Sequence, residues 1–128
     1  RDLLWQHTCF EAFVGLAPGG PYHELNLSPS GDWAAYAFRA YREPAPAREP
    51  GPVPAILTSA AGECLLLAAR VPLAGLSAAY AEAPIHLALS AVIEAESGEL
   101  SYFALCHPGE KPDFHHAGSF TLRLDPPA

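Results

Sequence analysis

Three polar side chains stand inside segments that are otherwise apolar, and their types suit them to binding chemistry. Glu11 belongs to the run CFEAFVG, and Glu24 and Asn26 belong to the run YHELNL. Burying carboxylates and amides is costly unless they find partners. Such groups can hydrogen-bond sugar hydroxyls or offer oxygen ligands to a calcium ion. They can equally belong to a solvated sheet face, or to a buried network with Arg39 that fixes strand register.

Aromatic rings accompany these polar residues. A sugar stacks its C–H face on a flat indole or phenol while neighbouring polar groups bind its hydroxyls. On extended strands Tyr22 shares a face with Glu24, and Trp33 shares one with Arg39. The same rings are also the usual filling between two sheets. The candidate ligand-binding residues are therefore Trp5, Glu11, Tyr22, Glu24, Asn26, Trp33 and Arg39.

Short strand-like segments would position these side chains. The first three are rich in aromatic and β-branched residues and are separated by turns that contain glycine and proline. They span Trp5–Val14, Tyr22–Leu27 and Trp33–Tyr41. If the first turn closes a hairpin, Glu11 faces Leu25 or Asn26 across it, because paired residue numbers then sum to about 36–37.

The rest of the chain also indicates short strands and no long amphipathic helix. The segment 43–54 is rich in proline and predicts an irregular excursion, and 72–84 predicts a connection with at most two helical turns. Regularly spaced short strands favour an antiparallel β-sandwich, so we expect residues 1–128 to form one all-β domain. The further strands are predicted at Ala55–Ser59, Glu63–Val71, Ile85–Ala95, Glu99–His107 and Ser119–Leu124.

Composition narrows the classes of partner. The net charge is −7, with 7 basic against 14 acidic residues, which argues against nucleic acid or an anionic membrane as the main partner. No apolar stretch is long enough for a membrane span. The 3 cysteines are far apart in sequence, which favours a reducing compartment over a disulfide framework. The absence of methionine suggests a fragment or a processed product.

Catalysis and cofactor binding have weaker signals. His107, His115 and His116 share a loop with Glu110 and Asp113, but their spacing matches no zinc signature. We expect a structural loop in which Asp113 and a histidine cap backbone groups, and we expect no cofactor. Haem would need two histidine ligands here. Hydrolase and nucleotide-binding motifs are absent, and we expect no enzyme.

Two Glu residues and one Cys leave catalytic alternatives open. Glu11 and Glu24 could form a carboxylate pair across strands, as in a glycosidase. Cys9 lies close to His7 in sequence, but a cysteine in so apolar a strand more often packs as an inert side chain.

Four stretches of the sequence resemble a known family. LWQHTCFEAF, YHELNLSPSGDWAAYAF, LSAVIEAESGELSYFALCHPGEKPDFHH and SFTLRL are similar to bacterial DOMON-like domain proteins, which are related to family 9 carbohydrate-binding modules. The resemblance covers nearly the whole chain. It implies a DOMON-like, immunoglobulin-like two-sheet sandwich that lacks some N-terminal strands of its relatives, and relatives that bind sugars or haem without catalysis.

The expected function is therefore non-catalytic binding of a carbohydrate or a similar polyhydroxylated ligand. The alternative is a structural or protein-interaction β-sandwich with no small-molecule site. A third interpretation is a haem-binding or metal-binding DOMON relative.

Overall fold

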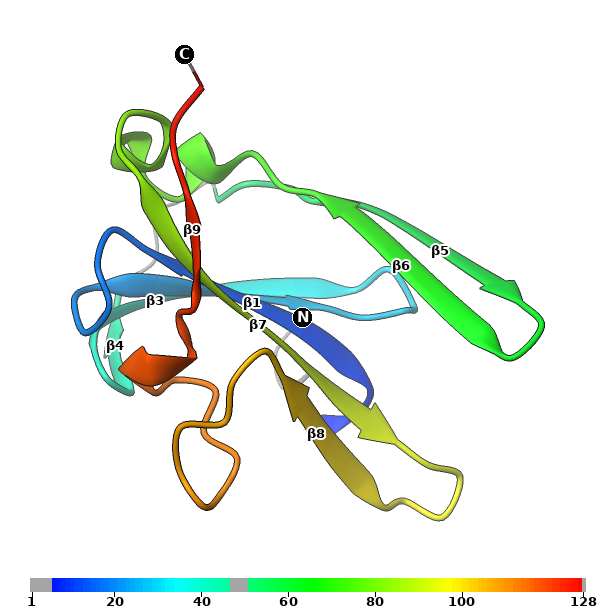
Figure 1. The fold of residues 1–128 in the computed structure, drawn as a ribbon. Coiled ribbons are helices and arrows are strands. Elements are labelled where there is room, and N and C mark those ends of the chain that lie inside the picture. Colours follow the sequence, from blue (N-terminus) through cyan, green and yellow to red (C-terminus); the bar gives the residue numbers. More distant parts are fainter. Residues whose placement is uncertain (1–5, 47–50, 128) are drawn as a thin grey trace.

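The computed structural model describes residues 6–46 and 51–127, and in this part of the chain the regular structure is all-β apart from short 3-10 turns (Figure 1). The predicted all-β class with two antiparallel sheets is confirmed. The strands are β1 Cys9–Gly15, β2 Tyr22–Leu27, β3 Trp33–Ala40, β4 Glu43–Ala45, β5 Ala55–Ala61, β6 Cys64–Arg70, β7 Ile85–Glu94, β8 Leu100–Ala104 and β9 Leu122–Leu124.

The main sheet has seven strands in the order β4-β3-β2-β1-β7-β8, with β9 paired to the first part of β7. All of its pairings are antiparallel. The second sheet is the β5–β6 hairpin, drawn in green in Figure 1. Most of the hairpin is exposed, and only Ile56 and Leu67 on its strands are half-buried.

The register of β1 and β2 confirms the predicted hairpin. Glu11 pairs with Asn26 and Phe13 pairs with Glu24, so the paired numbers sum to 37. Because side chains alternate along a strand, Glu11, Glu24 and Asn26 share one face of the main sheet. We call it the open face, and the opposite one, which carries Val14 and Leu25, the closed face.

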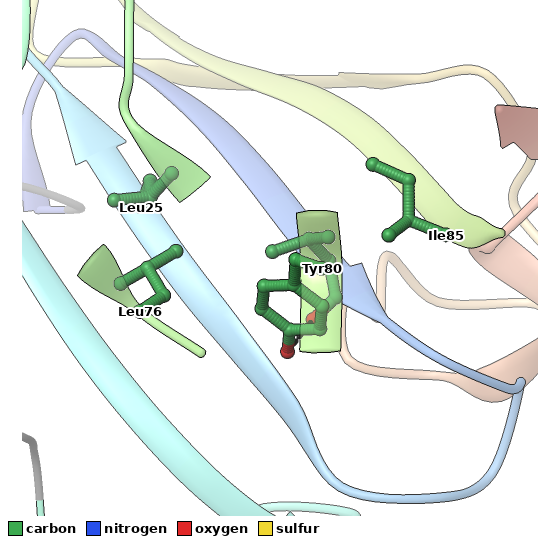
Figure 2. Packing of buried hydrophobic residues seen from close by; sticks show 5 residues of the cluster. Leu25, Leu76, Tyr80 and Ile85 are labelled. Atoms are coloured by element: carbon green, nitrogen blue, oxygen red, sulfur yellow. Dashed lines mark hydrogen bonds between the residues drawn. The ribbon is translucent and has the colours of Figure 1, made fainter. Parts of the chain in front are cut away.

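The connection between β6 and β7 covers the closed face. Its 3-10 turns, η2 Leu73–Gly75 and η3 Ala78–Ala81, bring two buried side chains onto the sheet. Leu76 and Tyr80 pack there against Val14, Leu25 and Ile85, as Figure 2 shows for this cluster. The Tyr80 hydroxyl also donates a hydrogen bond to the Val14 carbonyl at 3.0 Å. The closed face therefore obtains its core from a connection, and the exposed hairpin contributes little to it.

The strand predicted at Glu99–His107 ends at Ala104, and three further predicted boundaries need correction. The proline-rich segment begins with a short edge strand, β4, where Pro44 is tolerated because an edge strand has a free side. The last strand starts only at Leu122, since Ser119 lies in the 3-10 turn η4 Ala117–Ser119. The first strand starts at Cys9, and the predicted strand start at Trp5 lies outside the described residues.

Candidate functional site

The open face carries a pocket of about 830 Å³. Strands β1, β2, β3, β7 and β8 contribute to it, together with the loop between β8 and η4. Two buried carboxyl groups and several aromatic rings line the pocket. The carboxyls belong to Glu11 and Glu24, and the rings include Tyr36, Phe38, Tyr102 and Phe114.

The two carboxyl groups interact directly in the pocket. Glu11 is only 6% exposed and Glu24 only 5%, and the two side chains hydrogen-bond each other. Burial, followed by the charge of Glu24, raises the pKa of Glu11 to about 8. Burial also raises the pKa of Glu24. Two carboxylates this close cannot both ionise cheaply, so at neutral pH the pair shares a proton that Glu11 donates to Glu24.

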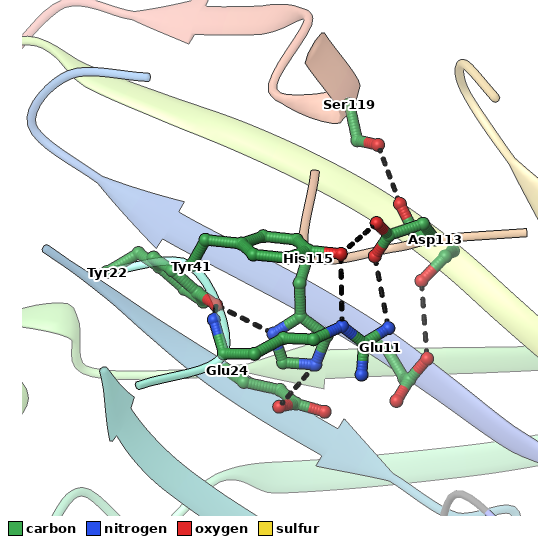
Figure 3. Close-up of polar contacts among 9 residues, drawn as sticks. Glu11, Tyr22, Glu24, Tyr41, Asp113, His115 and Ser119 are labelled. Carbon is green, nitrogen blue, oxygen red and sulfur yellow. Dashed lines mark hydrogen bonds and ion pairs between the residues drawn. The ribbon is translucent and has the colours of Figure 1, made fainter. Parts of the chain in front are cut away.

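Further contacts fix each carboxyl group in place. The Ser90 hydroxyl of β7 donates to Glu11 Oε2 at 3.4 Å, and His115 Nε2 lies 3.5 Å from Glu24 Oε2 (Figure 3). Burial, with a smaller contribution from the charge of Arg42, lowers the pKa of His115 to about 4. The imidazole is therefore neutral at pH 7, and its contact with Glu24 is a polar contact between N–H and carboxyl, not an ion pair.

Hydrogen bonds to Tyr22 identify the tautomer of His115. The Arg42 backbone N–H donates to the Tyr22 hydroxyl at 3.1 Å. That hydroxyl is then free to donate to His115 Nδ1, which lies 2.7 Å away. With Nδ1 acting as acceptor, the ring proton sits on Nε2 and faces Glu24. The imidazole thus presents a donor to the carboxyl pair.

The loop that carries His115 is clasped by the turn after β3. The Tyr41 hydroxyl donates to the Asp113 carboxylate, and Arg42 Nη2 donates to the same carboxylate at 3.0 Å. Burial alone would raise the pKa of Asp113, but these two donors outweigh it and lower the pKa. Arg42 adopts φ of 52°, a left-handed conformation that directs its backbone N–H to Tyr22. The clasp holds Phe114 and His115 against the open face.

Asn26 is the most enclosed polar residue of the open face. It is fully buried and pairs with Glu11 across the hairpin. Neither Nδ2 nor Oδ1 makes a well-aligned hydrogen bond with the described residues, but the amide interacts with the Glu24 carboxyl and acts against the rise of its pKa. Most buried polar atoms in proteins have partners, and the partner available to this amide is the Glu24 carboxyl on the same face.

The predicted binding residues divide between the two faces. Glu11, Tyr22, Glu24 and Asn26 lie together on the open face, which agrees with the predicted grouping, and of these four Glu11 and Glu24 line the pocket. Trp33 lies on the opposite face, because it alternates with Tyr36 and Phe38 along β3. Arg39 lies at the irregularity between Phe38 and Ala40, and its side chain is exposed. Trp5 lies outside the described residues.

The predicted alternative of a network between Arg39 and the buried carboxyls is wrong. The side chain of Arg39 is 67% exposed, and its Nη2 lies 3.5 Å from Glu43 Oε1. The cation that lines the pocket is Arg42, which the sequence did not single out. Arg42 lies in the turn after β3. Alternation of side chains along a strand does not predict where a turn residue points.

The three histidines of the C-terminal loop have separate roles. His116 Nδ1 accepts the Gly118 N–H at 2.9 Å, which is the expected cap of a backbone group. His107 stacks on Phe114 with ring centroids 6.1 Å apart, and His115 faces the pocket. The described part of the chain contains no group of three or more His, Cys, Asp or Glu side chains that could hold a metal ion.

Cys9 is buried on the open face, and burial, with a smaller effect of Glu11, raises the pKa of its thiol to about 12. The thiol is therefore protonated and suited to packing, not to nucleophilic attack.

Within the described ranges, no helix is long and apolar enough to cross a bilayer.

Comparison with known proteins gives no relative. No family model matches the sequence, and no curated protein and no solved structure matches it either.

Proposed function

We propose that the chain is a non-catalytic binding domain whose open-face pocket holds a carbohydrate or a similar polyhydroxylated ligand. The observation that carries the proposal is one pocket of about 830 Å³ in which aromatic rings surround hydrogen-bonding carboxyl groups. Pockets of this size accommodate small molecules, and a few precisely placed polar groups among apolar walls provide specificity. The pocket rings include those of Tyr36, Phe38, Tyr102 and Phe114, whereas Trp33, which was expected from sequence, lies on the opposite face.

The DOMON-like resemblance supports the same proposal. Its sequence blocks include YHELNL, which is β2, the strand that supplies Glu24 and Asn26. The all-β antiparallel fold agrees with a sandwich of that type. We therefore propose kinship with the DOMON-like and family 9 carbohydrate-binding proteins, with sugar binding as the shared property.

The geometry of the carboxyl pair supports binding over glycoside hydrolysis. A glycosidase needs its two carboxyl groups about 5–9 Å apart, so that the scissile bond and a water or nucleophile fit between them. Glu11 and Glu24 instead hydrogen-bond each other. Together they offer one polar surface on the floor of the pocket, which suits recognition of a ligand from one side.

Calorimetry with a pair of neighbouring aromatic variants tests the proposal. Tyr102 lines the pocket, whereas Phe103 is exposed on the other face of β8 and serves as the matched control. We expect heat of binding with at least one of glucose, cellobiose and xylose. Loss of a stacked ring by Tyr102→Ala should weaken that affinity about tenfold, or about 1.4 kcal/mol, and Phe103→Ala should leave it unchanged. Absence of heat with all three sugars would count against the proposal.

A structural or protein-interaction domain is the second candidate, and the β5–β6 hairpin favours it. Leu57 is 76% exposed and Leu66 is 65% exposed on this hairpin. An isolated two-stranded hairpin is only marginally stable in water. If the chain is an interaction domain, neither Tyr102→Ala nor Phe103→Ala will change the binding of sugars. Leu66→Ser will instead change the molecular mass that light scattering measures for the protein in solution.

A further inference from the structure

The pocket has more acidic than basic groups among the described residues that line it. Glu11 and Glu24 provide two carboxyl groups, and Arg42 is the one Lys or Arg side chain of the lining. The guanidinium of Arg42 is already bound to Asp113 at 3.0 Å. His115 is neutral at pH 7 because burial lowers its pKa to about 4. The carboxyl pair is thus left without a cation of its own.

A shared proton neutralises only part of the negative charge of the two carboxyl groups. With one proton between Glu11 and Glu24, the floor of the pocket still has one negative charge in a buried environment. An ammonium group has three N–H donors and a full positive charge, so it can replace the proton and hydrogen-bond both carboxylates. Ser90 and His115 would remain in place, because each already donates to one carboxyl group.

The aromatic walls suit the same kind of ligand. The face of an aromatic ring attracts a cation, and the effect grows when the cation is removed from water. Tyr36 and Phe38 on β3 and Phe114 on the loop line the pocket around the carboxyl pair. Aromatic faces placed around a cation are a recurring arrangement for recognising an ammonium group.

Asn26 supports the carboxyl pair from the same face of the sheet. Its side chain is fully buried, lies opposite Glu11, and interacts with the Glu24 carboxyl. An amide N–H that donates to a carboxylate favours its ionised form, and this interaction acts against the rise of the pKa of Glu24. The amide therefore favours the ionised pair that an ammonium group would bind.

We propose that the preferred ligand of the open-face pocket carries a protonated amino group beside its hydroxyls, as an amino sugar does, and that Glu11 and Glu24 bind this ammonium group. The inference rests on the proposed function and narrows its ligand class. Binding displaces the proton shared by the two carboxyl groups into solvent. A bare divalent cation is the less suitable occupant, because the described residues provide no group of three or more metal-ligating side chains.

Calorimetry of the whole chain with three matched sugars tests the proposal. Glucosamine, glucose and N-acetylglucosamine differ at one position, which carries an ammonium, a hydroxyl or a neutral amide. At pH 7 we expect glucosamine to bind at least tenfold more tightly than the other two. The measured heat should also differ between phosphate and Tris buffers, which take up a released proton with different enthalpies.

Two neutral variants locate the effect. Glu11→Gln and Glu24→Gln keep the shape of the side chain and mimic its protonated form, so we expect folded proteins. Each should lower the preference for glucosamine over glucose by about tenfold. Glu99→Gln, in the exposed turn before β8, is the control that should leave the preference unchanged. Thermal unfolding of each variant shows that loss of preference is not loss of fold.

The outcomes separate this inference from the proposed function. Equal binding of the three sugars overturns the ammonium inference and leaves carbohydrate binding standing. The same holds if the Gln variants keep the full preference, since the carboxyl pair would then not be the site. If glucosamine, glucose and N-acetylglucosamine all fail to bind while calcium chloride gives heat, both proposals fail in favour of a metal. If nothing binds, both fail.

Discussion

The two faces of the main sheet are built by the same strands, but their buried side chains have different kinds of partner. On β2, Leu25 points to the closed face and Glu24 to the open face, and both are at least nine-tenths buried. Leu25 meets apolar partners, Leu76 and Tyr80, from the connection that covers the closed face. Glu24 meets a second carboxyl group and a neutral imidazole.

The difference indicates a division of labour between the faces. Burial of apolar area is the main favourable contribution to folding, and the closed face provides it. Buried carboxyl groups contribute unfavourably to the free energy of folding, because desolvation disfavours their charged form. The open face therefore keeps groups that reduce stability and that would be useful to a ligand. Substitutions on each face test this contrast.

Truncating a closed-face side chain should have the largest effect on stability. Leu25→Ala removes a nearly fully buried leucine from the core and should lower the free energy of unfolding by about 3 kcal/mol. Leu66→Ala, on the exposed hairpin, is the matched control and should change it by less than about 0.5 kcal/mol. Urea denaturation followed by tryptophan fluorescence measures both. Equal losses would mean that the hairpin is buried in solution.

Neutralising the open-face carboxyl pair should change how stability depends on pH. The pKa of Glu11 is about 8 in the folded chain against 4.5 as the reference, so the folded state binds more protons between these values. Stability is therefore full below pH 4.5 and falls as pH rises toward 8. Glu11→Gln cannot ionise, and it should raise the free energy of unfolding at pH 8 by on the order of 2 kcal/mol while leaving it nearly unchanged at pH 4.5.

Urea titrations at both pH values check this result. Glu99→Gln replaces an exposed carboxylate and should show the wild-type pH dependence. A Glu11→Gln chain that loses stability at pH 8 would contradict the assignment, because it would show that the ionised carboxylate stabilises the fold.

Local sequence patterns predicted the strands and the grouping on the open face. The Tyr22–Leu27 strand was predicted with its observed bounds, and turn residues gave the register that pairs Glu11 with Asn26. Such features depend on side-chain alternation and short turns, which a sequence contains directly. The same alternation wrongly left Arg39 as a candidate partner of the buried carboxyls, since it does not tell which face of one strand aligns with which face of the next.

The contacts that complete the site are distant in sequence. His115 reaches Glu24 across 91 positions, and Asp113 reaches Arg42 across 71. Leu76 and Tyr80, which cover the closed face, belong to a segment that the sequence predicted only as a connection. No periodicity signals such pairings, because they depend on how loops fold back over the sheet.

The smallest predicted effect on stability concerns Asn26. Replacing it by an apolar residue gives one position of the open face the character of the closed face. A fully buried amide without a well-aligned hydrogen bond costs about 1–3 kcal/mol relative to an apolar group of similar shape, and β-branched residues suit a strand. Asn26→Val, which makes this position resemble the closed face, should therefore raise the free energy of unfolding by about 1 kcal/mol in urea denaturation. Asn26→Asp keeps the shape but adds a third acid beside Glu11, and it should be less stable than wild type at pH 7. A clear loss of stability in Asn26→Val would show that the amide is a structural strut with partners in solution, and the contrast between the two faces would then not extend to this residue.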